Sequence, residues 1–76
     1  MLPELGNKLR KARKSVFPKD DMYAFAVRLG VSRATLQKME KGDLSVSLEK
    51  YYRAAQLLGV ESSFDGLFDM EEDFFQ

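Results

Sequence analysis

Apolar residues in this 76-residue chain recur at intervals of three and four positions, the spacing that places side chains on one face of an α-helix. Pro18, Gly30, Gly42 and Gly59 interrupt this spacing, and such residues are typical of helix boundaries. The pattern predicts four helices and a fifth, short one, over residues 5–16, 22–29, 33–41, 47–58 and 64–68. Residues 44–47 are expected to form a loop, and no other segment alternates as a strand would. The predicted fold class is therefore all-α.

The chain contains no cysteine and no histidine. It therefore lacks disulfides, thiolate nucleophiles, the commonest zinc ligands and the usual base near neutral pH. Its serines have no histidine to activate them, so we expect no enzymatic activity, no metal and no cofactor. Because no apolar run approaches the ~18 residues of a membrane span and the first residues lack a signal-peptide pattern, we expect a cytoplasmic protein without membrane association.

The length of the chain predicts one small domain. A domain of this size buries only about 60% of the surface that its unfolded chain exposes, so its stability as a monomer is modest. Self-association adds buried surface and stabilises the folded state. A homodimer is therefore expected from size alone.

The charges cancel in total but are divided along the chain. Residues 1–60 contain all twelve Lys and Arg and six acids, giving +6, whereas residues 61–76 contain the other six acids and no cation, giving −6. A cationic body attracts a polyanion, and an acidic end limits indiscriminate binding or meets a basic partner. A solvated basic face with a solubilising tail would have the same composition.

The predicted helix at residues 33–41 has one face that is entirely polar or small, whereas Leu36 and Met39 lie on the other face. The residues of the polar face are Arg33, Ala34, Gln37 and Lys38. Arginine pairs with guanine and glutamine with adenine in the major groove, a small alanine lets the backbone approach, and lysines bind phosphates. An ordinary surface helix also uses these residues, because they are good helix formers. A short helix directly after the Gly30 turn is nevertheless what reading the major groove requires.

Residues 26–42 resemble the helix-turn-helix of the Cro/C1-type (XRE) regulators. The resemblance is carried by Ala26 at the helix crossing, Gly30 four residues later, Val31-Ser32, and the ending Glu40-Lys41-Gly42. Residues 5–13 and 57–60 resemble the first helix and the end of the fourth helix of that family. The resemblance implies a five-helix lambda-repressor-like DNA-binding domain, which we place at residues 1–68, followed by an acidic-aromatic tail at residues 69–76.

The resemblance also implies a function. The chain is expected to be a sequence-specific transcriptional regulator, a repressor that places helix 33–41 in the major groove of a pseudo-palindromic operator in double-stranded DNA. The expected base-reading residues are Arg33, Ala34, Gln37 and Lys38. The expected phosphate contacts are Lys19, Ser32, Lys41 and Ser45. Where the family usually has a phosphate-binding glutamine, this chain has Met22, and Lys19 in the longer preceding connection is expected to replace that contact.

Glu40 lies beside Leu36 on the predicted helix, one turn before its end, so its carboxylate is expected to be partly buried and to need a partner. The resemblance pairs it with Arg13 of the first helix. Such a pair would join the first helix to the reading helix through a bidentate hydrogen bond. In the other interpretation, Glu40 is exposed and contributes little to stability.

Large apolar residues continue among the acids at the end of the chain. Phe64, Leu67 and Phe68 are expected to complete the core or to meet a second copy, whereas Phe74 and Phe75 fit either packing or a partner protein. Residues 42–48, with the tyrosines at 51 and 52, also resemble the HipB-like antitoxins of HipA-like kinase modules. Two alternatives therefore stand beside the repressor: an antitoxin that binds a toxin kinase and represses its own operon, and a protein-interaction module without DNA binding.

Overall fold

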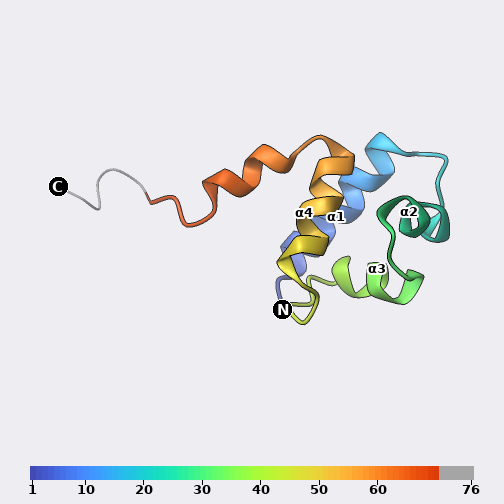
Figure 1. Cartoon of the computed structure of the whole chain (residues 1–76), viewed down its shortest axis with the longest axis horizontal. Helices are drawn as coiled ribbons and strands as arrows, with labels where there is room; N and C mark the ends of the chain where they lie inside the picture. The colour runs from blue at the N-terminus through green and yellow to red at the C-terminus, as the bar shows by residue number, and fades with distance from the viewer. Residues whose placement is uncertain (71–76) are drawn as a thin grey trace.

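The structure is a computed structural model that describes residues 1–70, and within this range it contains four α-helices, one 3-10 helix and no strand (Figure 1). The elements are α1 (Pro3–Val16), α2 (Met22–Leu29), α3 (Arg33–Met39), α4 (Leu48–Leu58) and η1 (Glu61–Gly66). The predicted all-α fold class is confirmed, and residues 44–47 form a loop before α4. The prediction for Phe74 and Phe75 lies outside the described residues.

Two helix boundaries differ from those predicted. The third helix ends at Met39 rather than at residue 41, because Gly42 turns the chain into the left-handed region at φ 75° and Lys41 lies in that turn. The fifth helix is a 3-10 helix that ends at Gly66, so the prediction of a helix through Leu67 and Phe68 was wrong. A segment this short gains too few backbone hydrogen bonds to propagate an α-helix, and 3-10 geometry is common in such short pieces.

Short polar side chains begin three of the helices, as their positions in the sequence indicate. The side chain of Asp21 accepts a hydrogen bond from the backbone N–H of Ala24 at 2.8 Å, and the Ser32 hydroxyl accepts one from Thr35 at 3.0 Å. Ser47 caps α4 in the same way. Each cap satisfies a backbone donor that the helix itself leaves without a partner, so these boundaries are encoded locally.

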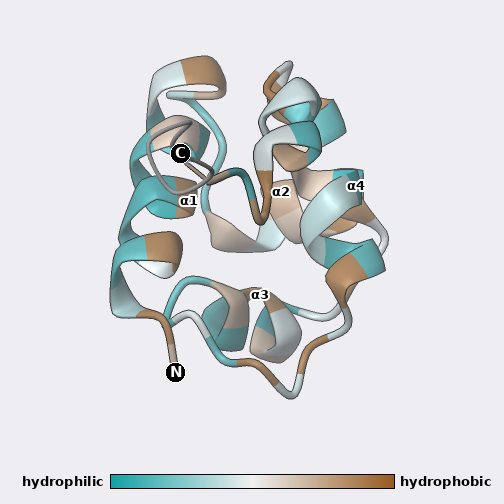
Figure 2. Ribbon diagram, turned by 90° about the vertical axis from the view of Figure 1, so that its left-hand side faces the viewer, coloured by the Kyte–Doolittle hydropathy of each residue, from teal (hydrophilic) through white to brown (hydrophobic). Residues whose placement is uncertain are grey.

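Helix α1 packs against α4, and α2 packs against both α3 and α4. In Figures 1 and 2, α3 lies across the end of the molecule where the chain begins, below the upright α1. Figure 2 shows hydrophilic and hydrophobic residues alternating along the turns of α1, as an amphipathic helix requires. The buried core is formed by Leu9, Phe25, Ala26, Leu29, Leu36, Met39, Val46, Tyr51, Ala54 and Leu58.

Phe25, Leu36 and Met39 are completely buried, two of them on the short α3. Burying such a side chain contributes roughly 1.5–3 kcal/mol. Isolated helices of seven residues are unstable in water, so α3 exists because its inner face packs on the other helices. This leaves the outer face of α3 free of any packing role.

An ion pair joins α1 to the turn that follows α3. The Arg13 guanidinium donates from Nε to Glu40 Oε2 at 2.6 Å and from Nη2 to Oε1 at 3.2 Å, which makes the contact bidentate. Both side chains are more than nine-tenths buried. Each charge therefore depends on the other, because water solvates neither of them well.

We expect Glu40→Ala to lower the free energy of unfolding by about 3–5 kcal/mol, because it leaves the Arg13 charge buried without a partner. The double variant Arg13→Met/Glu40→Leu should recover much of this loss, because it removes both charges. Urea unfolding followed by circular dichroism measures both effects.

The matched control is the exposed pair between Glu49 and Arg53, whose closest atoms lie 3.6 Å apart. Glu49→Ala should lower the free energy of unfolding by less than about 1 kcal/mol. Equal losses for Glu40→Ala and Glu49→Ala would contradict the structural role of the buried pair.

Candidate nucleic-acid interface

The turn between α2 and α3 brings the two helices together at a fixed angle. Gly30 adopts φ 78°, and its N–H and that of Val31 both donate to carbonyl oxygens in the last turn of α2. Ala26, 1% exposed, lies at the helix crossing, where a larger side chain would separate α2 from α3. A tight turn of this kind after a buried helix holds the second helix out on the surface, where it can meet another molecule.

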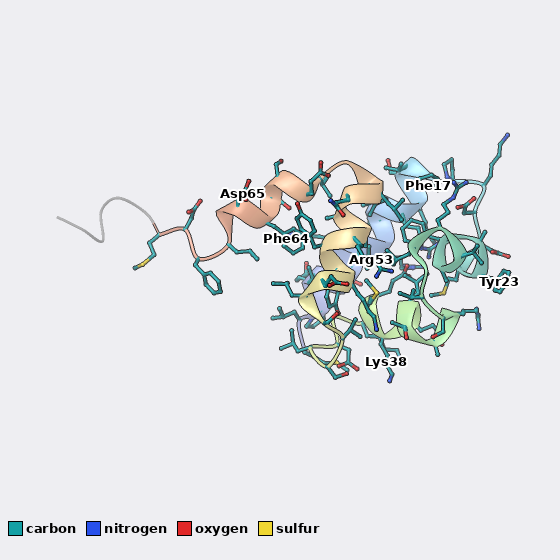
Figure 3. The ribbon with its side chains drawn as sticks, viewed as in Figure 1. Phe17, Tyr23, Lys38, Arg53, Phe64 and Asp65 are labelled. Atoms are coloured by element: carbon teal, nitrogen blue, oxygen red, sulfur yellow. The ribbon has the colours of Figure 1, made fainter. Side chains whose placement is uncertain are left out.

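The outer face of α3 is exposed along its whole length. The four predicted base-reading residues, Arg33, Ala34, Gln37 and Lys38, are all exposed, whereas Leu36 and Met39 point into the core. In Figure 3, Lys38 extends away from the body of the molecule. The face thus presents guanidinium, amide and ammonium donors together on a helix whose other side is immobilised by packing.

The four predicted phosphate contacts are all exposed but lie in three different places. Ser32 precedes α3, and its hydroxyl is engaged in the cap and in a contact with Thr35 Oγ1 at 3.0 Å. Lys41 and Ser45 lie after α3, in the turn and the loop that lead to α4. Lys19 lies in the connection between α1 and α2, so the structure brings Lys41 and Ser45 to one end of α3 and leaves Lys19 apart from them.

The loop after α3 is ordered by its own hydrogen bonds. The Asp43 carboxylate accepts from the backbone N–H of Ser45 at 2.8 Å, and this hydrogen bond holds the pKa of Asp43 below its ordinary value. The buried Tyr51 donates its hydroxyl to the Asp43 carbonyl oxygen at 2.7 Å. Burial raises the pKa of Tyr51, so the phenol stays protonated and remains a donor. The loop therefore keeps one shape beside α3.

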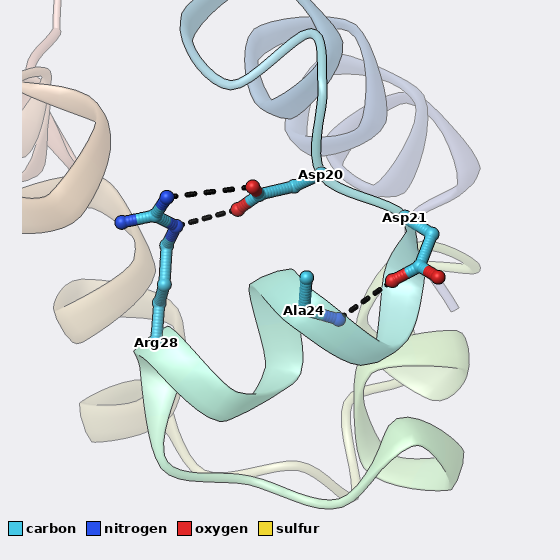
Figure 4. Close-up of polar contacts among 4 residues, drawn as sticks. All are labelled: Asp20, Asp21, Ala24 and Arg28. Atoms are coloured by element: carbon cyan, nitrogen blue, oxygen red, sulfur yellow. Dashed lines mark hydrogen bonds and ion pairs between the residues drawn. The ribbon is translucent and has the colours of Figure 1, made fainter.

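The start of α2 is already occupied by an anion. Figure 4 shows the Asp21 carboxylate on the backbone N–H of Ala24, where a helix N-terminus would otherwise attract a phosphate. Met22 is half-buried and packs against the core, so it offers no polar group in place of the usual glutamine. A phosphate contact at this helix N-terminus is therefore disfavoured by the residues present.

Asp20, in the connection between α1 and α2, also has a partner within the protein. Its carboxylate pairs with Arg28, as Figure 4 shows, and the hydrogen bond from this pair raises the pKa of the guanidinium. Arg28 also lies 4.4 Å from the centre of the Phe17 ring, a cation–π contact. Both acids of this connection thus have partners within the protein, Asp20 in the pair with Arg28 and Asp21 in the cap of α2.

Arg53 has a role that the sequence reasoning missed. Its guanidinium donates to the carbonyl oxygen of Leu29 at the end of α2, and Figure 3 shows Arg53 on α4. This contact joins α4 to the end of α2, where the helix-turn-helix corner begins. On the predicted fourth helix Arg53 lies away from the apolar face, so the sequence contained no signal for this contact, and its partner is a backbone atom that no sequence pattern marks.

The predicted apolar group at the end of the domain is divided in the structure. Phe64 is half-buried and meets Tyr52 edge to face at 5.3 Å between ring centres, as its place beside α4 in Figure 3 illustrates. Leu67 and Phe68 do not complete the core: Leu67 is 48% exposed and Phe68 is 98% exposed. Phe68 is also the one non-glycine residue among those described with a positive φ, at 70°.

Residues 1–70 contain no cluster of three or more acidic, histidine or cysteine side chains placed to hold a metal ion. No helix in that range combines the length and the apolarity needed to cross a membrane.

Comparison with known proteins agrees with the geometry of α2, the turn and α3. The family model described as helix-turn-helix matches residues 21–64, more than half of the chain. No curated protein and no solved structure gave a match. The matched span begins at the Asp21 cap and ends at Phe64, and so includes the corner, the exposed outer face of α3 and the supporting α4. By this match and by the arrangement of its helices, the chain belongs to the Cro/C1-type (XRE) family of helix-turn-helix regulators, with a lambda-repressor-like fold.

Proposed function

We propose that this DNA-binding regulator is a sequence-specific repressor that places α3 in the major groove of its operator. The observation that carries the proposal is the outer face of α3, where four exposed residues able to meet base edges stand on a helix with a fully buried inner face. Arg33 pairs with guanine and Gln37 with adenine through two hydrogen bonds each, while Ala34 lets the helix approach. Lys38 completes the reading face.

Phosphate contacts on either side of α3 hold the helix in the groove. We assign them to Ser32 before the helix, to Lys41 and Ser45 after it, and to Lys19 beside α2. Contacts to phosphates carry no sequence information, but they set the register of the protein on the duplex. Repression follows when the bound protein covers a promoter.

The proposed DNA-binding unit is a homodimer. Leu48, Tyr52, Phe64, Leu67 and Phe68 line a groove along α4 and η1, and the large apolar residues Leu48, Leu67 and Phe68 are strongly exposed there. Exposed apolar patches of this kind mark association surfaces. A two-fold dimer requires a pseudo-palindromic operator whose half-site centres are about one helical turn, 10–10.5 bp, apart.

An antitoxin is the second candidate function. The nearly complete exposure of Phe68 favours it, because an isolated aromatic side chain on a strained backbone fits insertion into a partner's pocket. The partner would be a HipA-like toxin kinase. The two functions are compatible, since an antitoxin of this family would also repress its own operon.

Arg33→Ala and Gln37→Ala should each weaken binding to the cognate operator by about 1–3 kcal/mol and relax the preference at one base pair of each half-site. The operator is first selected from random DNA by the unsubstituted chain, and footprinting then compares the variants. The controls are Arg10→Ala on α1 and Gln56→Ala on α4, which remove the same exposed groups elsewhere. Full protection of the operator by both α3 variants would exclude α3 as the reading helix.

Binding should weaken steeply as salt rises, because phosphate contacts release counterions from DNA. Lys41→Ala should reduce the slope of log K against log salt by about one unit without changing the preferred sequence. Lys14→Ala is the matched control, because this exposed lysine lies in the last turn of α1 and is not among the proposed phosphate contacts. Filter binding between 50 and 200 mM salt, roughly the range over which such contacts are lost, measures the slopes. Equal slopes for Lys41→Ala and the unsubstituted chain would remove Lys41 from the phosphate contacts.

Phe68→Ser should shift the chain from dimer to monomer in sedimentation velocity, because it removes the most exposed large apolar side chain from the proposed interface. Val27→Ser, on the exposed face of α2, is the control and should leave assembly unchanged. An unchanged sedimentation coefficient for Phe68→Ser would contradict the dimer surface and would favour the partner-binding role of the antitoxin candidate.

A further inference from the structure

The first turn of α1 lies against the turn that follows α3, with backbone on backbone. The N–H of Leu2 donates to the carbonyl oxygen of Gly42 at 2.8 Å, and the Leu2 carbonyl accepts from Gly6 at 3.2 Å. Gly6 is buried on the face of α1 that meets this turn. The contact thus joins the second residue of the chain directly to the turn that follows α3.

No side chain fits at either glycine of this contact. A Cβ on Gly6 would overlap the carbonyl group of Glu40 and would lie 2.6 Å from the Gly42 nitrogen. A Cβ on Gly42 would overlap the Leu2 carbonyl. Real Cβ atoms do not come within 3.0 Å of other heavy atoms, and here the neighbours are backbone atoms that cannot rotate away as a side chain can.

We infer that Gly6 is a positioning residue for DNA reading, although it lies on the inner face of α1 and outside the exposed face of α3. Together with Leu2 and Gly42 it forms a backbone stop that sets how closely the end of α3 approaches α1. This inference rests on the proposed function of α3 as the reading helix. According to this inference, α1 contributes to sequence specificity through the position that it gives α3, and not through residues of the reading face.

The mechanical argument begins with the length of α3. The helix ends at Met39, only one residue before the Glu40 carbonyl that Gly6 touches, so a displacement of the turn moves the last turn of the helix with it. The start of α3 is held independently by the Gly30 corner and the Ser32 cap. A wider spacing at one end therefore tilts the helix instead of shifting it as a whole.

A tilt affects base reading more than it affects general attraction to DNA. Paired hydrogen bonds to a base need donor–acceptor distances near 3 Å and angles above about 150°, so recognition sites must be held to about 0.5 Å. Phosphate attraction depends mainly on charge and tolerates such a shift. The expected signature of a disturbed Gly6 is thus a loss of preference for the operator, with binding to unrelated DNA retained.

Helix propensity by itself gives the opposite expectation. Alanine is a better helix former than glycine in a helix interior, so Gly6→Ala would stabilise α1 if the site were open. The backbone contact makes the substitution destabilising instead. The sign of the change in melting temperature therefore tests the contact itself, independently of any DNA measurement.

The experiment compares Gly6→Ala with Gly59→Ala. Unlike Gly6, Gly59 has a positive φ, 75°, and a Cβ there meets nothing within 4 Å, so Gly59→Ala strains the backbone at the end of α4 and leaves the contact with α3 intact. Both variants are measured at a temperature at which circular dichroism shows them folded. Affinities are determined for the selected operator and for a scrambled duplex of equal length.

We expect Gly6→Ala to lose about tenfold in operator affinity, the size of one base contact, while its affinity for the scrambled duplex stays within about twofold. Gly59→Ala should keep the operator preference of the unsubstituted chain. Equal operator preference in Gly6→Ala and Gly59→Ala would overturn the positioning role.

A second pair of variants tests the same contact if Gly6→Ala does not fold. Leu2→Pro removes the N–H that donates to Gly42, whereas Leu2→Ala keeps it and removes only the half-exposed side chain. Leu2 precedes α1, so neither change alters a helical residue. Leu2→Pro should lose operator preference and Leu2→Ala should keep it, and equal preference in the two would overturn the inference. An absence of operator preference in the unsubstituted chain would instead overturn the proposed function.

Discussion

The buried ion pair between Arg13 and Glu40 is the contact on which the rest of the structure depends. It joins the first helix to the turn after α3 by two hydrogen bonds in a place that water does not reach. A pair of this kind adds little net stability compared with an apolar pair, but breaking it is costly. It therefore selects one arrangement of the helices over compact alternatives that would leave a charge buried alone.

The same region explains how the seven-residue α3, the proposed reading helix, is held in a fixed position. Alone, α3 would not persist in water. It is held by a cap and a glycine corner at its start, by Leu36 and Met39 beneath it, and by the α1 contacts at its end. Tertiary contacts thus hold α3 at its start, at its inner face and at its end, and they leave its outer face exposed.

The basic and acidic parts of the chain are also separated in the part of the fold that the structure describes. The exposed lysines and arginines of the described residues lie on the helical body, while residues 61–70 carry acids and no cation, and Figure 1 shows these residues running away from α3. An acidic segment placed apart from a cationic reading face weakens general attraction to DNA more than it weakens specific contacts.

Local signals in the sequence determined the fold class and the position of the helix-turn-helix. The helix spacing, the Asp21 and Ser32 caps and the Gly30 corner each depend on residues within one or two turns, so the all-α fold, the helix-turn-helix and the outward face of α3 were predictable. The resemblance to a known family supplied the partner of Glu40. The exposure of Phe68 and the 3-10 form of η1 were not predicted, because both depend on how few core residues pack against residues 61–68.

Only the tertiary structure decided which backbone atoms meet across the fold. Arg53 supports the Leu29 carbonyl, Tyr51 holds the Asp43 carbonyl, and Gly6 fits against the turn after α3. The apolar spacing that predicted the first helix did not mark Gly6, because a residue without a side chain carries no signal of the backbone that it meets. Sequence patterns mark side chains, whereas these contacts are made to carbonyl and amide groups that every residue carries, and the path of the folded chain alone selects among them.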